Sequence, residues 1–251
     1  MPTMLLAAVL TIIFAWNWRE TRRYREFRAC EDSARRLAFY WSWTWTSFVI
    51  LGLGSIGILA AIGRMDALFA IPSEFARLAP RDPNVPIENM SGDTLAGFFI
   101  GAALSLGVVA FVWHRRLRKM THPVVGDIEP LLPRNGHETL MAIPVSLNAG
   151  LSEELFFRLA LPLLIAAVTG SALVGLVAAT IAFGLMHWYQ GWKGVLVTSQ
   201  VGALFAWIYV VSGSLPKVII LHALVDIMAL IVRPAVSRLM LRRTANSSLV
   251  A

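Results

Sequence analysis

Cysteine and charged residues are both scarce in this chain of 251 residues. The one cysteine, Cys30, excludes an internal disulfide and a cysteine-rich metal site. Charged residues make up 15% of the chain and hydrophobic residues 57%, whereas a soluble domain has about 25% charged residues. These proportions exclude a disordered chain and an ordinary soluble globular domain.

Acidic residues are fewer than basic ones, 15 against 22, and the formal net charge is +7. Such an excess can indicate binding to nucleic acid. Here, however, the basic residues lie in short segments between long apolar runs, a pattern typical of the cytoplasmic loops of a membrane protein. We therefore expect the lipid bilayer as a partner, and no nucleic acid.

The apolar runs are too long for the core helices of a soluble domain and predict an all-α, polytopic transmembrane helical bundle. Backbone polar groups must be paired inside lipid, so each span should be a helix. We expect about seven spans, and the pattern admits six to eight. They are residues 3–18, 37–62, 94–113, 138–168, 171–189, 192–211 and 215–232.

The number of basic residues alternates between high and low from loop to loop. Loop 19–36 holds seven and loop 114–137 holds five, whereas loop 63–93 between them holds three. The positive-inside rule then places the N-terminus outside and the C-terminus in the cytoplasm, with the protein in the inner membrane if its source is bacterial. In the outer loop, residues 66–79 are expected to lie flat as a broken amphipathic helix.

Few ionisable residues remain inside the predicted spans. The acids, histidines and arginine found there are Glu153, Glu154, Arg158, His187, His222 and Asp226. A charge at the centre of a span costs about 2.5–3.5 kcal/mol. These side chains should therefore face the interior of the bundle, where they mark a functional site by default.

Two of these residues form a plausible structural pair. Glu154 and Arg158 stand at i,i+4, on one helix face, and can neutralise each other. Glu153 sits about 100° around the same helix and has no local partner. An unpaired intramembrane carboxylate is the stronger candidate for a functional role.

Three short motifs collect the intramembrane residues on separate spans. They are Glu153-Glu154-x-x-x-Arg158, Phe183-x-x-x-His187 and His222-x-x-x-Asp226. We expect four side chains to converge from three helices: Glu153, His187, His222 and Asp226. A carboxylate with two imidazoles suits two chemistries, either general-base activation of water beside an oxyanion site or a metal-bound water.

In this order, and on separate hydrophobic segments, the three motifs resemble those of the CAAX-protease and bacteriocin-processing family, also called the Abi family. Its members include the type II CAAX prenyl endopeptidases. The resemblance covers about residues 138–232. We accordingly divide the chain into an N-terminal membrane region (1–137), a catalytic core (138–232) and a cytoplasmic tail (233–251).

The resemblance implies a role for each motif residue. The residues implied to activate the attacking water are Glu153 and His187. Those implied to support the site are Glu154, Arg158 and Phe183. Those implied to stabilise the oxyanion or complete the site are His222 and Asp226.

Asp226 departs from the family pattern, because the prenyl endopeptidases resemble H-x-x-x-N at this motif. An asparagine can donate an N–H to a developing oxyanion, whereas an ionised aspartate can only accept. Three roles stay open. Asp226 stays protonated and donates, or it accepts from His222 and orients that ring, or it joins Glu153, His187 and His222 around a metal such as zinc. We favour the second role, which requires no cofactor.

The favoured function is an intramembrane, glutamate-dependent endopeptidase of the CAAX type. It would hydrolyse a peptide bond in a hydrophobic or lipidated peptide or protein, with a zinc metalloprotease as the alternative chemistry. Two other function classes are a non-proteolytic scaffold or bacteriocin self-immunity protein on the same fold, and an ion-coupled transporter. The lack of paired half-repeats counts against the transporter. The sequence assigns neither a particular substrate nor an oligomeric state.

Overall fold

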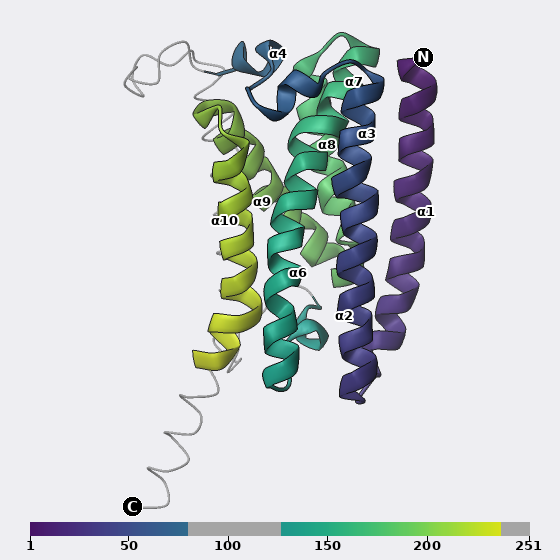
Figure 1. Ribbon diagram of the computed structural model, residues 1–251, viewed down its shortest axis with the longest axis vertical. Coiled ribbons are helices and arrows are strands. Elements are labelled where there is room, and N and C mark those ends of the chain that lie inside the picture. The colour runs from purple at the N-terminus through teal and green to yellow at the C-terminus, as the bar shows by residue number, and fades with distance from the viewer. Residues whose placement is uncertain (80–126, 237–251) are drawn as a thin grey trace, which may run out of the picture.

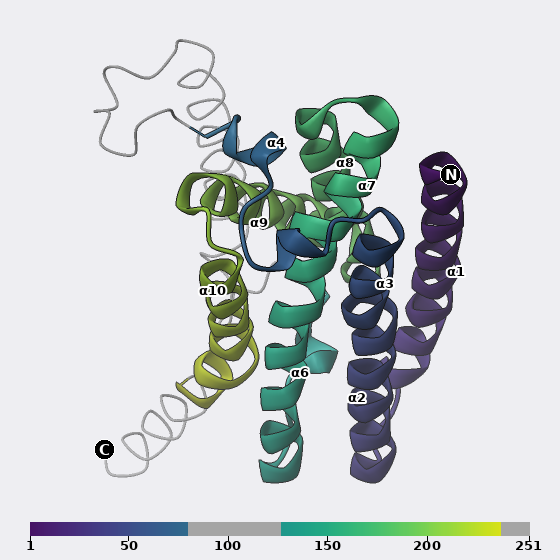
Figure 2. The same ribbon diagram turned by 45° about the horizontal axis from the view of Figure 1, so that its top comes forward.

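The computed structural model describes residues 1–79 and 127–236 (Figure 1). Within these ranges it contains helices and no strand, which confirms the all-α prediction. Most of the long helices run side by side along one direction (Figure 1), and α9 (Gly191–Ser212) is inclined to them (Figure 2). The predicted span 94–113 lies outside the described residues, as does most of the tail.

The N-terminal helices are longer than predicted. Their bounds are α1 Pro2–Arg28, α2 Ser33–Ser47, the π-helical turn η1 Phe48–Leu53 and α3 Gly54–Ala61. The prediction of a loop over 19–36 is wrong for most of that stretch. Arginine is a good helix former, so α1 continues through the basic segment. The next helix begins after Asp32, whose side chain accepts a hydrogen bond from the backbone N–H of Arg35 at 2.7 Å.

The second half of the chain forms the helices that the sequence predicts over 138–232, with ends that differ by a few residues. Their bounds are η5 Glu129–Leu131, α6 Gly136–Glu154, η6 Leu155–Ala160, α7 Leu161–Thr169, α8 Ala172–Met186, η7 Trp188–Gln190, α10 Leu215–Ile227 and η8 Met228–Val232. Gly170 and Gly213 end α7 and α9 in the left-handed conformation, with φ of 73° and 64°. Such a C-terminal glycine stops a helix cleanly.

Four helices in the described part of the chain are long and apolar enough to cross a membrane, which confirms an integral membrane protein. They are Pro2–Arg28, Ser33–Ala61, Trp188–Ser212 and Leu215–Val236. A shorter apolar helix covers Ala172–Met186. The continuous helix α6–η6–α7 is not among the four, and it carries Glu153, Glu154 and Arg158 within six residues. The total of seven spans stays a prediction.

The helix α6 lies between α2 and α10, and α7 and α9 both pack against α8. The approach of α10 to α6 is close at Gly150, where a Cβ atom would lie 2.7 Å from the carbonyl oxygen of Ile219. Because Gly150 has no side chain, α10 can pack closely against α6, one turn before Glu153 and Glu154.

Arg36 and Glu138 form a buried ion pair, although the sequence analysis placed both residues in loops or at the ends of spans. Arg36 and Glu138 are 0% and 1% exposed, and Arg36 Nε lies 3.1 Å from Glu138 Oε2. The Arg36 guanidinium also donates to the carbonyl oxygens of Pro130 and Leu132 and stacks over the ring of Phe27. The pair fastens the first turn of α2 to the first turn of α6. It was missed because both residues stand at the ends of apolar runs.

The predicted outer segment 66–79 contains two short helical pieces, η2 Met65–Leu68 and α4 Ser73–Ala76. The break in the helix is confirmed, and the expectation that the segment lies flat on the outer side stays a prediction. Arg64 Nη1 donates to Glu74 Oε1 at 2.6 Å and so ties the end of the α2–α3 helix to α4.

Candidate active site

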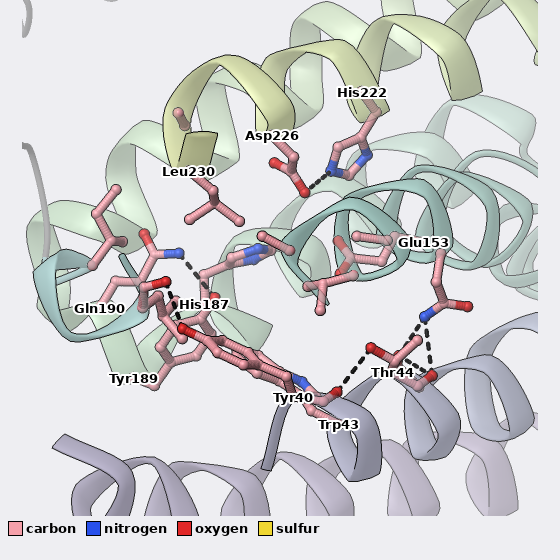
Figure 3. Close-up of a pocket in the computed structure, with 18 residues that line it drawn as sticks. Tyr40, Trp43, Thr44, Glu153, His187, Tyr189, Gln190, His222, Asp226 and Leu230 are labelled. Carbon is pink, nitrogen blue, oxygen red and sulfur yellow. Dashed lines mark hydrogen bonds and ion pairs between the residues drawn. The ribbon is translucent and has the colours of Figure 1, made fainter. Parts of the chain in front are cut away.

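A cavity of about 130 Å³ lies among α2, α6, α10 and the segment after α8 (Figure 3). All four residues that the sequence expected to converge contribute to its lining: Glu153, His187, His222 and Asp226. A water molecule occupies about 30 Å³ in the liquid, so the cavity has room for a few of them. The motif residues are therefore brought together around a space that can hold a nucleophilic water.

Glu154 is the centre of a fully buried network. Arg158 Nε donates to Glu154 Oε2 at 2.8 Å, and the two side chains are each 0% exposed. The i,i+4 pair predicted from the sequence is confirmed. Glu154 Oε1 also accepts from His222 Nδ1 at 2.7 Å, a contact that joins α6 to α10. The sequence did not predict this contact, because it depends on how the two helices are aligned.

His222 lies between two carboxylates, and its hydrogen bond is to Glu154. His222 Nε2 lies 3.9 Å from Asp226 Oδ2, too long for a hydrogen bond. The two groups are nevertheless within ion-pair distance, so the role expected for Asp226 in holding this ring stays a prediction. Because Nδ1 is bound to Glu154, Nε2 is the nitrogen that faces Asp226 (Figure 3).

His187 is held by the end of its own helix. Its backbone N–H donates to Gly184 O, which leaves the carbonyl of Phe183 free to accept from His187 Nδ1 at 2.8 Å. A carbonyl only accepts, so Nδ1 carries the proton and Nε2 of the neutral ring has a free lone pair. The Phe183 ring packs against the His187 ring, with centroids 4.8 Å apart, and under the Arg158 guanidinium at 4.6 Å. Phe183 thus supports both motifs.

Glu153 lies next to the buried network but does not join it. Its Oε2 atom is buried and has no hydrogen-bond partner among the described residues. The π-helical turn η6 begins two residues later, and such turns often occur at functional sites because they change the direction of side chains. A buried carboxylate oxygen without a partner beside a water-sized space is suited to accept a proton from water.

Residues 135–228 match the family model described as type II CAAX prenyl endopeptidase Rce1-like. This segment contains all three motifs, so the resemblance drawn from them is confirmed, and protease activity of a general kind goes with that family. No curated protein and no solved structure matches the chain. The domain boundaries proposed at 137 and 232 stay a prediction.

The N-terminal region supplies one wall of the cavity in the Rce1-like segment. Tyr40, Trp43, Thr44 and Ser47 of α2 line it. Tryptophan side chains favour the membrane interface. Trp41 and Trp45 are indeed exposed, at 62% and 57%. Trp43 lies between them in sequence and therefore about 200° around the helix, which turns it inward. The spacing of the three tryptophans could therefore have indicated that α2 has an inward-facing side as well as a lipid-facing one.

A metal site on the four lining residues does not fit the structure as it stands. Within residues 1–79 and 127–236, no group of three or more His, Cys, Asp or Glu side chains is arranged to hold a metal ion. We therefore derive no step of the Rce1-like chemistry through a metal.

Proposed function

We propose that this protein is an intramembrane CAAX-type endopeptidase in which Glu153 is the general base. The observation that supports this most directly is the unpartnered Oε2 of Glu153 in a cavity shared with His187. His187 presents Nε2 with a lone pair, since Nδ1 donates to Phe183. A water molecule that donates one hydrogen to each residue would be oriented for attack on a peptide carbonyl.

In the proposed reaction, Glu153 takes a proton as the water oxygen attacks the scissile carbonyl carbon. The carbonyl electrons move onto oxygen and form a tetrahedral oxyanion. The C–N bond then breaks, its electron pair goes to nitrogen, and Glu153 returns the proton to the leaving amine. Positioned general-base catalysis of this kind contributes about 10²–10⁴-fold in rate.

The remaining motif residues position the site. Glu154 and Arg158 neutralise each other in the interior and fix His222 from one side. Asp226 lies 3.9 Å from the other nitrogen of the ring. Hydrogen bonds between catalytic side chains are often long before the substrate binds and shorten in the substrate complex. We propose that His222 and Asp226 contact the substrate peptide at the bond to be cleaved.

The substrate that best fits the family is a protein whose C-terminus ends in a prenylated C-a-a-X sequence. We propose that it arrives from the cytoplasmic side, where the basic loops are expected. No cofactor is required on this scheme.

The test uses purified protein in liposomes and two synthetic peptides, one with a farnesylated C-a-a-X end and one unmodified. We expect cleavage of the farnesylated peptide and loss of at least 100-fold in Glu153→Gln. Glu31→Gln, at an exposed position outside the cavity, is the control. Full activity in Glu153→Gln would refute the general-base role. A wild-type protein that cleaves neither peptide would favour the non-proteolytic alternative.

A further inference from the structure

An oxyanion formed in this cavity requires hydrogen-bond donors, and most of those in its walls are already in use. The hydroxyl of Tyr40 donates to Leu131 O at 3.0 Å, and that of Thr44 to Tyr40 O at 2.8 Å. The amide of Asn148 donates to Thr44 O and Ser47 Oγ. Asp226 stands where the prenyl endopeptidases resemble H-x-x-x-N, and an ionised aspartate accepts hydrogen bonds but donates none. The usual amide donor at that position is therefore missing.

Tyr189 is the exception among the hydroxyls that line the cavity. Its oxygen accepts a hydrogen bond from Gln190 Nε2 at 3.1 Å. Its own proton has no acceptor among the residues that the structure describes. Because Gln190 donates to the oxygen, it fixes the hydroxyl in place and polarises it, which strengthens the bond that the hydroxyl can donate.

The ring of Tyr189 is held beside His187. It stands two residues after His187, and the two ring centroids are 5.9 Å apart. Trp43 of α2 packs edge-on against it at 5.4 Å, and Tyr24 of α1 at 4.9 Å. Figure 3 shows Tyr189 and Gln190 on the His187 side of the cavity. A donor fixed by packing before the reaction costs no reorganisation when charge develops.

We propose that the hydroxyl of Tyr189 donates a hydrogen bond to the scissile carbonyl oxygen and stabilises the oxyanion. The inference rests on the proposed endopeptidase function. When water attacks and Glu153 takes its proton, the carbonyl oxygen gains the negative charge and the hydroxyl bond to it strengthens. The hydroxyl proton stays on Tyr189, and the bond weakens again when the C–N bond breaks.

The test is Tyr189→Phe, which removes the hydroxyl and keeps the ring. With the farnesylated peptide we expect kcat to fall about 10²–10³-fold, as when one oxyanion donor is removed, and KM to stay within twofold. A phosphinate analogue of the same peptide, which mimics the tetrahedral intermediate, should bind more weakly by the same factor. Gln190→Met, which removes the polarising bond, should lower kcat about threefold to tenfold.

Tyr209→Phe is the matched control, because Tyr209 is buried on α9 and does not line the cavity. If Glu153→Gln is inactive but Tyr189→Phe keeps kcat within threefold of wild type, this inference fails and the proposed function stands. A rise in KM at constant kcat would make Tyr189 a binding residue and also overturns it. If Glu153→Gln is active, the proposed function itself fails.

Discussion

Glu153 and Glu154 are neighbours in the sequence and have opposite surroundings in the fold. Glu154 binds Arg158 and His222 and is completely buried. Glu153 keeps one buried oxygen unpaired beside the cavity. On the proposed mechanism, Glu154 has a structural role and Glu153, the adjacent residue, has the chemical one.

Substitution of these two acids should give opposite results. Glu154→Ala leaves Arg158 buried without its partner and should lower the free energy of unfolding by about 3–5 kcal/mol. Glu153→Ala removes a group without a hydrogen bond, so the fold should persist while activity is lost. Thermal unfolding in detergent checks the stability of the two variants, and a peptide cleavage assay checks their activity. Equal stability of the two variants would show that the network around Glu154 does not hold the bundle together.

Asp226→Asn restores the residue type of the family pattern and tests how Asp226 acts. An asparagine amide can both accept and donate hydrogen bonds, so it can donate to substrate, whereas an ionised aspartate only accepts. We expect activity within tenfold of wild type, unchanged by a chelator. Loss of activity together with loss of one bound metal per chain, measured by elemental analysis, would establish a metalloprotease instead.

The residue-scale predictions that succeeded were those within one helix. The Glu154–Arg158 contact follows from i,i+4 spacing, and the lack of a partner for Glu153 follows from the same geometry. The contact of His222 with Glu154 crosses 68 residues of sequence. Spacing along one helix says nothing about the alignment of two helices, so the hydrogen bond from His222 to Glu154 was not predicted.

At the scale of elements, the site depends on how closely α10 approaches α6. The contact occurs at Gly150, one turn before Glu153 and Glu154, and opposite Ile219 and Ala223 on α10. Ala223 directly follows His222. The register that places His222 on Glu154 is therefore set by a position without a side chain.

Gly150→Ala should separate α10 from α6. The added Cβ would lie 2.7 Å from Ile219 O and 3.0 Å from Ala223 N, so backbone must move. Overpacking of this kind costs about 1–3 kcal/mol, and activity should fall because His222 shifts with α10. Gly57→Ala, where nothing lies within 4 Å, is the control and should be neutral or slightly stabilising. Equal thermal stability of the two variants would contradict close packing at Gly150.

The Arg64–Glu74 pair should make the α4 region sensitive to acid. The hydrogen bond from Arg64 lowers the pKa of Glu74 to about 2 from the model-peptide value of 4.5. The stabilisation is complete above pH 4.5 and is lost as the pH falls toward 2. Both side chains are partly exposed, so the effect should be at most about 1 kcal/mol. The stability difference between wild type and Glu74→Gln, followed by thermal unfolding, should shrink over that interval. A difference that stays constant would show that the pair does not stabilise the fold.

Helix positions were predictable from apolar periodicity, and helix ends less so. Segment 192–211 coincides with α9 to within one residue at each end. The helix α1 continues ten residues past its predicted end because its arginines stay helical and pair with Glu20. The π-helical turns η1, η6 and η8 could not be predicted from hydropathy, because the same apolar residues can form an α-helical or a π-helical turn.

For the whole molecule, the N-terminal region is part of the site rather than a separate anchor. A connected aromatic cluster links α1 and α2 to Tyr189 of η7. Its members are Tyr24, Phe27, Phe39, Tyr40, Trp43 and Tyr189. Two of its members from α2 also line the cavity. The Rce1-like segment 135–228 therefore supplies the motif residues and depends on the preceding helices for one wall.

The described ends of the two basic segments that the sequence placed in the cytoplasm, around residues 30–33 and 134–135, meet at one end of the bundle. Arg134 Nη1 donates to Cys30 O at 3.1 Å, and Asn135 donates to Ser33 at 2.8 Å. The N-terminus and α4 lie at the opposite end (Figure 1). A measurement on one loop therefore fixes the orientation of both segments.

Cysteine labelling can decide the orientation, because Cys30→Ser removes the single cysteine and gives a clean background. In that background, Glu31→Cys marks the basic end and Ser73→Cys the opposite end, and both positions are exposed. We expect a membrane-impermeant maleimide to label Ser73→Cys in intact spheroplasts and Glu31→Cys only after permeabilisation. The reverse pattern would place the basic loops outside, against the positive-inside rule. Ile128 and Leu131 lie at the basic end and line the cavity, so the same result also identifies the side of the membrane toward which this part of the cavity lies.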